Sequence, residues 1–248
     1  MIVGVDSLKS LTIATPFYNE SEGLNNYFKT LNKINKLISK KIKVKYLFID
    51  DGSVDNTLIK LFNFKKKNKS LNIKIYKHKV NQGYGRTLKN SIHLCDTDYL
   101  ITYDSDCSYD YRLISKLIKK IQLEKLDIIN VSFKLSKQKT DISFFRKTLS
   151  IGSVIINNFF FPEIKKYGVQ VLTCSFRIYK TNKINKINLI SDDFNCCAEL
   201  LIKSMKKRLK IREIAGKNLG RKFGKSKMKI IKNIINSLKM IYFIKFKD

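Results

Sequence analysis

Two aspartates separated by a single residue, Asp104 and Asp106, follow the apolar run 99–103. Side chains two positions apart on an extended chain point to the same side, so both carboxylates can face one hard cation such as Mg²⁺ or Mn²⁺. That cation can also take oxygens from a diphosphate and neutralise the charge that develops on a leaving phosphate. Pairs at this spacing also occur in solvated turns, so the interpretation as a metal site depends on the loops around it.

Two further polar loops follow apolar runs in the first half of the chain. They are residues 15–20 (TPFYNE) and residues 50–57 (DDGSVDNT). In the second loop, Ser53 or Asp55 is suited to cap the next helix. Beyond that local role, carboxylates in these loops can accept hydrogen bonds from a base and a ribose. Three polar loops at one edge of a sheet would form a ligand site.

Short apolar runs alternate with longer helical stretches and would position these loops. The runs predict strands at residues 11–15, 44–49, 73–76, 99–103 and 127–131. Apolar residues at three- and four-residue spacing predict helices at 24–37 and 113–121. The alternation is typical of βαβ units, so the expected fold class is α/β, with a mostly parallel sheet flanked by helices. Such sheets bind ligands at the carboxyl ends of their strands.

The second half of the chain has a different pattern. A polar stretch at 134–141 and an apolar, aromatic segment at 151–161 predict a loop and lid region. A helix is expected at 194–205 and a short strand at 210–214, followed by a basic cluster at 221–229. Residues 228–247 space isoleucines along one helical face with lysines among them, which predicts a basic amphipathic helix.

The composition excludes several classes of protein. The 248 residues carry 50 Lys and Arg against 20 Asp and Glu, a net charge of +30, yet 44% are hydrophobic, which is enough for a packed core. The charge suggests a polyanion or an anionic membrane surface. Nucleic acid is disfavoured because aromatic side chains are not interleaved with the basic cluster as a platform for stacked bases would require. Five cysteines without a CxxC pair indicate reduced thiols in the cytosol.

No secretory signal or apolar span of transmembrane length is visible in the sequence, so we expect a soluble or peripheral protein.

Four segments in order, TPFYNE, FIDDGSVDNT, NQGYGRTLKNSI and ITYDSDCS, resemble family 2 glycosyltransferases with the GT-A (Rossmann-like) fold. Later segments are similar to the branch that makes polyprenyl-phosphate (dolichyl-phosphate) mannose and glucose. They are TCSFR at 173–177, ELLIK at 199–203 and RKFGKSK at 221–227. The resemblance implies a catalytic domain over residues 1–227, followed by the C-terminal helix at 228–248.

The resemblance also implies roles for individual residues. The positions that match nucleotide-sugar contacts are Pro16, Tyr18, Glu20, Asp50, Asp51, Ser105 and Lys227. The catalytic positions are Asp104, Asp106, Arg146 and Arg221. The metal, Mg²⁺ or Mn²⁺, would be held by Asp104, Asp106 and Ser108, where Ser108 stands in place of the branch's glutamine. Arg221 and Lys227 match a pair that clamps phosphate oxygens.

The implied reaction is an inverting transfer of a sugar from a UDP- or GDP-linked donor. A polyprenyl phosphate acceptor is already anionic and needs no general base. This agrees with a chain whose two histidines, His78 in a predicted strand and His93 in a helix, fall outside the motifs. The alternative acceptor is a cell-surface glycan hydroxyl, for which Asp192 or Asp193 is the candidate base. A second alternative is a non-catalytic basic binding protein.

The basic C-terminal helix favours a membrane-borne acceptor, since such a helix can lie in the interface of an anionic leaflet. Because the chain ends at this helix, the expected location is the cytoplasm, peripheral to the inner face of the cytoplasmic membrane. The sequence leaves the oligomeric state open.

Overall fold

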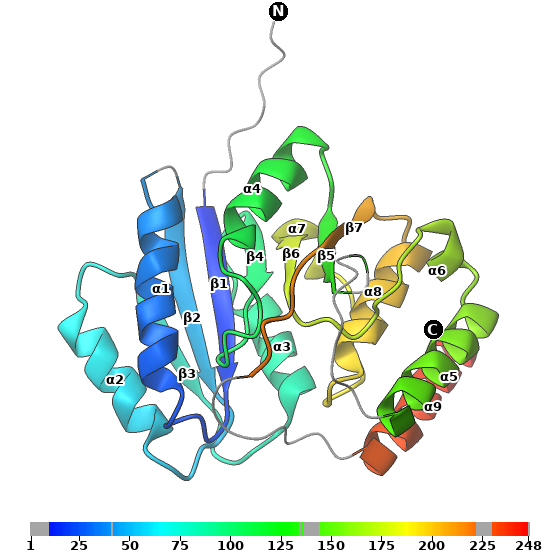
Figure 1. Ribbon diagram of the computed structural model, residues 1–248, viewed down its shortest axis with the longest axis horizontal. Helices are drawn as coiled ribbons and strands as arrows, with labels where there is room; N and C mark the ends of the chain where they lie inside the picture. Colours follow the sequence, from blue (N-terminus) through cyan, green and yellow to red (C-terminus); the bar gives the residue numbers. More distant parts are fainter. Residues whose placement is uncertain (1–9, 41, 134, 136–143, 222–229, 248) are drawn as a thin grey trace, which may run out of the picture.

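A seven-stranded sheet, in the order β3-β2-β1-β4-β6-β5-β7, forms the centre of the described structure (Figure 1). The computed structural model describes residues 10–40, 42–133, 135, 144–221 and 230–247. The strands are β1 (Ser10–Phe17), β2 (Lys43–Asp50), β3 (Ile73–Lys77), β4 (Tyr99–Thr102), β5 (Ile128–Ser132), β6 (Arg177–Lys180) and β7 (Ile211–Ala215). Neighbouring strands are parallel except at β6, which runs antiparallel to both β4 and β5.

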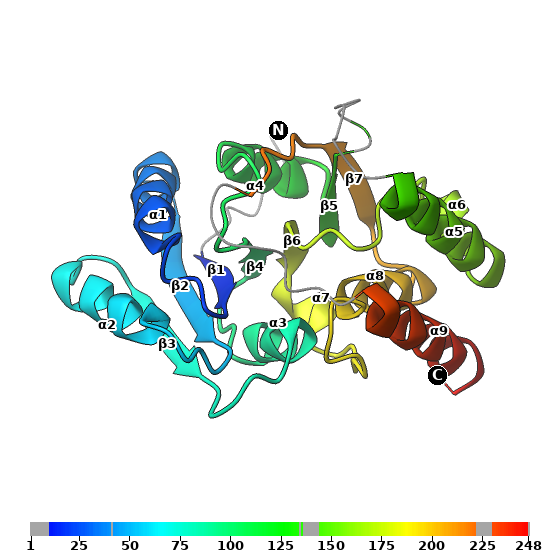
Figure 2. The same ribbon diagram turned by 60° about the horizontal axis from the view of Figure 1, so that its bottom comes forward.

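Helices cover both faces of this sheet (Figure 2). Residues of α1 (Leu24–Ile38), α2 (Thr57–Lys67) and α4 (Leu113–Leu123) pack into one apolar cluster with one side of the strands. A second cluster contains residues of α3 (Tyr84–His93), α6 (Glu163–Lys166), α7 (Thr181–Ile184) and α8 (Cys196–Lys206). The central strands β1, β4, β5 and β6 are therefore buried on both sides, as their apolar runs require.

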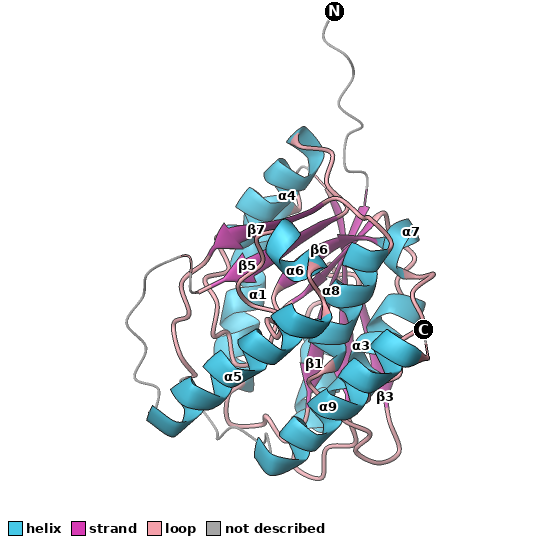
Figure 3. Cartoon of the chain, turned by 90° about the vertical axis from the view of Figure 1, so that its right-hand side faces the viewer, coloured by secondary structure: helices cyan, strands magenta, loops and turns pink. Residues whose placement is uncertain are grey.

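The last long helices, α5 (Phe144–Phe160) and α9 (Ile230–Phe246), lie side by side at one end of the molecule (Figure 3). Met240, Ile241 and Ile244 bury one side of α9 in the second cluster. Among the described residues, no helix combines the length and apolar character needed to cross a membrane.

The structure confirms the predicted α/β class, the five strands of the first half and the strand near 210–214, with bounds shifted by one or two residues. It corrects two other predictions and shows one further strand. The lid segment at 151–161 lies mostly within helix α5. His78 follows β3 rather than lying in it. Strand β6 was not predicted. The basic amphipathic helix is confirmed as α9, while a domain boundary at residue 227 stays a prediction.

Strand β6 begins at a fully buried arginine, Arg177. Because a charged residue at this position interrupts the apolar pattern, the sequence did not predict a strand here. The Arg177 side chain is 0% exposed. Its Nε donates to Asn130 Oδ1 at 2.6 Å and its guanidinium also donates to the carbonyls of Cys197 and Leu172. Arg177 thus joins β6 to β5 and to α8, because a buried cation is stable only where its donors are satisfied.

Candidate active site

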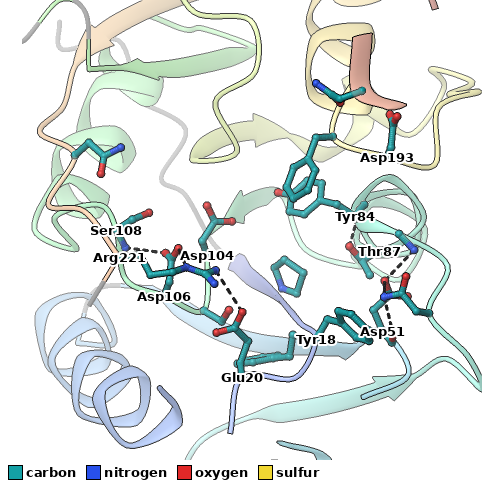
Figure 4. Close-up of a pocket in the computed structure, with 18 of the residues that line it drawn as sticks. Tyr18, Glu20, Asp51, Tyr84, Thr87, Asp104, Asp106, Ser108, Asp193 and Arg221 are labelled. Carbon is teal, nitrogen blue, oxygen red and sulfur yellow. Dashed lines mark hydrogen bonds and ion pairs between the residues drawn. The ribbon is translucent and has the colours of Figure 1, made fainter. Parts of the chain in front are cut away.

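A cavity of about 900 Å³ opens at the carboxyl ends of β1, β2 and β4 (Figure 4). Its walls also include the loop that leads into α3, the turn before α8, the segment after β7 and α9. The sequence-predicted residues that line it are Pro16, Tyr18, Glu20, Asp51, Asp104, Ser105, Asp106, Ser108, Asp193 and Arg221. The volume is in the range of small-molecule sites.

Asp104 and Asp106 face this cavity from a turn rather than from an extended segment. Strand β4 ends at Thr102, and the Cys107 N–H donates to the Asp104 carbonyl at 3.2 Å. Cys107 has a φ of 53°, the left-handed conformation that such a turn requires. The two carboxylates therefore share the cavity because the chain turns back, and this corrects the expectation from strand alternation.

The Asp104 carboxyl is harder to ionise than an ordinary aspartate, and its pKa is raised. Burial, followed by repulsion from Asp106, raises the pKa of Asp104 to about 7, against the opposing effects of Ser175 and Arg221. Ser175 Oγ donates to Asp104 Oδ2, while Asp106 Oδ1 accepts from the Ser108 N–H at 2.9 Å. A cation bound between Asp104 and Asp106 would offset this repulsion, so the pair is suited to bind one.

Arg221 supplies one positive charge to this cluster. Its Nε lies 3.0 Å from Asp106 Oδ2 and its terminal nitrogen 3.3 Å from Glu20 Oε1. The segment after β7 positions it, because the Leu219 N–H donates to the Ser108 carbonyl at 2.7 Å and Asn218 forms a β-bridge with Tyr109. Residues more than 100 positions apart in the sequence thus meet at the predicted metal site.

The donor set fits a hard divalent cation that is shared with a ligand. Within the described ranges, no group of three or more His, Cys, Asp and Glu side chains could enclose a metal ion. Mg²⁺ typically uses one or two carboxylates and completes its shell with water and phosphate oxygens. The pair Asp104 and Asp106 matches that arrangement, with Ser108 beside it in the cavity wall.

The loop after β2 is held by its own hydrogen bonds. Asp51 accepts from His78 Nδ1 at 2.6 Å and from the N–H groups of Gln82 and Gly83 at 2.8 and 2.9 Å. It also accepts from Asn81 Nδ2 at 2.9 Å. The role of His78, which is buried, was missed from the sequence because nothing local indicates its partner. Asp51 fixes the loop that leads from β3 into α3.

Asp50 lies beside this network and is buried, but it is not among the residues that line the cavity. Its Oδ2 accepts from the Ser53 N–H at 3.1 Å. Its Oδ1 is buried and has no hydrogen-bond partner in the part of the chain that the structure describes. Contact between Asp50 and a nucleotide stays a prediction.

The loop after β1 is joined to the start of α2. The Asn19 N–H donates to Ser53 Oγ at 2.9 Å, and the Ser21 N–H donates to Asp55 Oδ2 at 3.1 Å. Asp55 Oδ1 also accepts from the Thr57 N–H at 2.9 Å, in an Asx turn that leads into α2, whose N-cap residue is Asn56 rather than Ser53 or Asp55. These contacts set the positions of Tyr18 and Glu20 at the cavity wall.

The two aspartates before α8 have different surroundings. Asp192 pairs with Arg86 at 3.1 Å and with Lys89 at 2.9 Å, and it does not line the cavity. Asp193 does line the cavity. Of the two candidate bases, only Asp193 is in a position to meet a ligand there.

Two predicted phosphate contacts fall where the structure gives no side-chain geometry. Arg146 belongs to α5, in the part of that helix whose side chains are not described, and Lys227 lies outside the described residues. Their roles stay predictions. The cavity residues that were not predicted from the sequence are Phe17, Asn81, Gly83, Tyr84, Thr87, Phe194, Asn218, Gly220, Asn233 and Asn236.

The sequence model of glycosyl transferase family 2 matches residues 12–187, a span that contains the three acidic loops. The chain belongs to this family. A dolichyl-phosphate beta-glucosyltransferase from Dictyostelium discoideum is 25% identical over 218 residues, which are 83% of this chain and 65% of that protein. A dolichol-phosphate mannosyltransferase from Pyrococcus furiosus is 23% identical over 232 residues, covering 94% of this chain and 62% of that protein.

A third relative of this member of glycosyl transferase family 2 is a processive diacylglycerol beta-glycosyltransferase from Mycoplasma genitalium. It is 24% identical over 187 residues, which are 75% of this chain and 48% of that protein. The chain thus spans about half to two thirds of the length of these relatives.

A solved structure confirms the GT-A fold of this family 2 glycosyltransferase. Glucosyl-3-phosphoglycerate synthase from Mycobacterium tuberculosis, in complex with Mn²⁺, UDP and glucosyl-3-phosphoglycerate, matches it with a TM-score of 0.70. The sequences are 14% identical, and the match covers 97% of this chain and 80% of the other. At this identity the likeness concerns the fold.

Proposed function

We propose that the protein transfers a sugar from a nucleoside diphosphate sugar, with a divalent cation held by Asp104 and Asp106. The observation that carries this proposal is the pair of carboxylates beside Arg221 in a cavity that can hold a small molecule. The cation would neutralise the charge on the departing diphosphate. Arg221 would bind a phosphate oxygen through its guanidinium, and Tyr18 and Pro16 would contact the nucleoside. The solved relative binds UDP with Mn²⁺.

We propose a polyprenyl phosphate as the acceptor. Two of the relatives are named for dolichyl or dolichol phosphate. A phosphate oxygen is already anionic, so it can attack the anomeric carbon without a general base. Attack from the face opposite the diphosphate would invert the configuration at that carbon.

The paired helices α5 and α9 support peripheral binding to the inner face of the cytoplasmic membrane. Large apolar side chains on both helices are exposed: Ile155, Ile156, Phe159, Ile234, Ile235, Leu238, Tyr242, Phe243 and Phe246. Phe159 is 80% exposed. Exposed lysines at 239, 245 and 247 accompany them on α9. Apolar side chains with nearby lysines suit the interface of an anionic leaflet.

A glycan acceptor is the second candidate, and the place of Asp193 in the cavity wall favours it. A sugar hydroxyl must lose its proton as it attacks, and Asp193 is the carboxylate that could accept it.

Donor hydrolysis and sugar-lipid formation test these proposals. The protein is incubated with Mn²⁺ and a panel of UDP- and GDP-sugars, alongside Asp106→Ala. We expect metal-dependent release of a nucleoside diphosphate by the wild type only. Absence of turnover and of nucleotide binding would refute the enzymatic proposal and favour a binding protein. Undecaprenyl phosphate is then added, and an extractable sugar-lipid is expected only if the acceptor is a polyprenyl phosphate.

A further inference from the structure

At the end of the cavity away from the predicted metal pair, several lining residues have no role in the proposed reaction. Figure 4 shows Asp193 at the opposite end from Asp106 and Arg221, with Tyr84 and Thr87 between Asp193 and Asp51. Asn233 and Asn236 of α9 complete this wall. Because a phosphate acceptor needs no base, the presence of Asp193 here requires another explanation.

The Asp193 carboxylate is held by amide groups. Its Oδ1 accepts from the Asn195 N–H at 2.9 Å. Its Oδ2 accepts from Asn236 Nδ2 at 2.6 Å and from Asn195 Nδ2 at 3.1 Å. A carboxylate has about four acceptor positions. These three bonds fix its orientation and leave capacity for one further donor, such as a hydroxyl group in the cavity.

The turn that carries Asp193 is rigidly attached to the nucleotide side of the molecule. The Gly85 N–H donates to the Asp192 carbonyl at 2.9 Å. A Cβ atom at Gly83 would lie 2.4 Å from the same oxygen, so the backbones meet where only glycine fits. From the other side, Glu199 accepts from the N–H groups of Ile190 and Ser191, each at 2.8 Å. The turn is thus preorganised before any ligand binds.

Two aromatic rings lie next to the carboxylate. Tyr84 and Phe194 are stacked, with centroids 4.9 Å apart and planes inclined by 15°. Both residues line the cavity. Aromatic side chains offer apolar contact area, which matches the C–H face of a pyranose ring, while carboxylate and amide groups match its hydroxyls.

We infer that Asp193, Tyr84 and Phe194 bind the sugar that is transferred, and that Asn236 is a positioning residue that holds Asp193. This inference rests on the proposed function, because it takes the diphosphate to lie at Asp104 and Asp106. It gives α9 two roles, since Asn233 and Asn236 line the cavity while other residues of the helix, among them Leu238 and Phe246, expose apolar side chains. Asp193 then recognises a hydroxyl group rather than removing a proton.

Binding of matched ligands separates sugar recognition from nucleotide recognition. UDP, UDP-glucose, GDP and GDP-mannose are titrated with Mn²⁺ into the wild type, Asp193→Asn and Asp192→Asn. The neighbouring Asp192 is a matched control because its carboxylate pairs with Arg86 and Lys89 outside the cavity. A lost bond to a charged group costs about tenfold or more in affinity. We therefore expect Asp193→Asn to bind the nucleotide-sugar at least tenfold more weakly and the free nucleotide unchanged.

Asn236→Leu provides a second variant of similar side-chain volume. It removes the shortest bond to Asp193, and we expect the same selective loss, about threefold to tenfold, with thermal unfolding close to that of the wild type. Asp192→Asn should bind all four ligands as the wild type does.

The outcomes are distinct. If the wild type binds neither nucleotide nor nucleotide-sugar, the proposed function fails. If the wild type binds both but Asp193→Asn and Asn236→Leu bind the nucleotide-sugar normally, the sugar-binding inference fails. Normal nucleotide-sugar binding with lost turnover in Asp193→Asn would identify Asp193 as a base instead and would also overturn the inference.

Discussion

The loops after β2 and β4 leave the sheet on either side of β1, and each carries an aspartate that lines the cavity. Asp51 is surrounded by donors, since His78, Asn81 and two backbone N–H groups all bond to its carboxylate. Asp104 accepts from Ser175 but has another carboxylate, Asp106, as its neighbour, and its pKa is raised to about 7. A carboxylate that is saturated by its own chain stabilises the loop, whereas one that faces a like charge is poised for a ligand.

The same substitution in the two loops should separate these roles, and Asp104→Asn should have the larger effect. Asparagine keeps an acceptor for Ser175 but removes one of the two charges that would hold the metal. We expect metal-dependent donor hydrolysis to fall by about 100-fold or more. Thermal unfolding at pH 8 without metal should stay unchanged or move upward, because the substitution removes a partly desolvated charge that Asp106 repels.

Steady-state kinetics and melting curves measure both parts of this prediction. Asp110→Asn is the control, since Asp110 pairs with Arg112 and does not line the cavity. A variant that loses activity only because it unfolds earlier would contradict the distinction between the loops.

Asp51→Asn should mainly affect stability. The amide presents a donor to groups that are themselves donors, so N–H groups of the loop after β3 lose a charged acceptor. Bonds to charged groups contribute about 1.5–3 kcal/mol each, and we expect the free energy of unfolding to fall by about 2–4 kcal/mol. Urea denaturation measures this change, and a fully stable Asp51→Asn protein would show that the network does not hold the loop.

Arg221→Gln sharpens the comparison with the smallest expected change. Arg221 pairs with Asp106 and Glu20, and its side chain is 27% exposed. Without it, Mn²⁺ alone should bind a few-fold more tightly, because Asp106 loses a competing cation. UDP with Mn²⁺ should bind about tenfold more weakly, because a phosphate contact is lost. Calorimetric titration measures both affinities. If the affinities for Mn²⁺ alone and for UDP with Mn²⁺ change in the same direction, Arg221 does not contact the diphosphate.

The first half of the fold was predictable because its signals are local. Apolar runs mark the strands, and the polar loops follow where these runs end, so Asp104 and Asp106 could be placed at the sheet edge from the sequence alone. The turn at Cys107 could not, because a positive φ at a residue other than glycine leaves no sequence pattern. The geometry of the pair Asp104 and Asp106 therefore came only from the structure.

The rest of the site depends on contacts between distant segments. From the sequence, Asn236 is simply a polar residue of a predicted helix. Nothing near it in the sequence indicates that it donates a hydrogen bond to Asp193. In the same way, the sequence gives no reason to assign different roles to the neighbouring Asp192 and Asp193. The structure does, because Asp192 forms ion pairs with Arg86 and Lys89. Strand β6 was missed because its short run starts with a charged residue whose donors are satisfied by remote carbonyls.

The place of β6 between β4 and β5 has a consequence for synthesis of the chain. Strand β4 is made early, but the strand that covers its open side is formed by residues 177–180. Until those residues leave the ribosome, the nascent chain exposes an unpaired strand edge, a known template for aggregation. Fragments that end before residue 177 should therefore precipitate, and the chain is best expressed with both halves together.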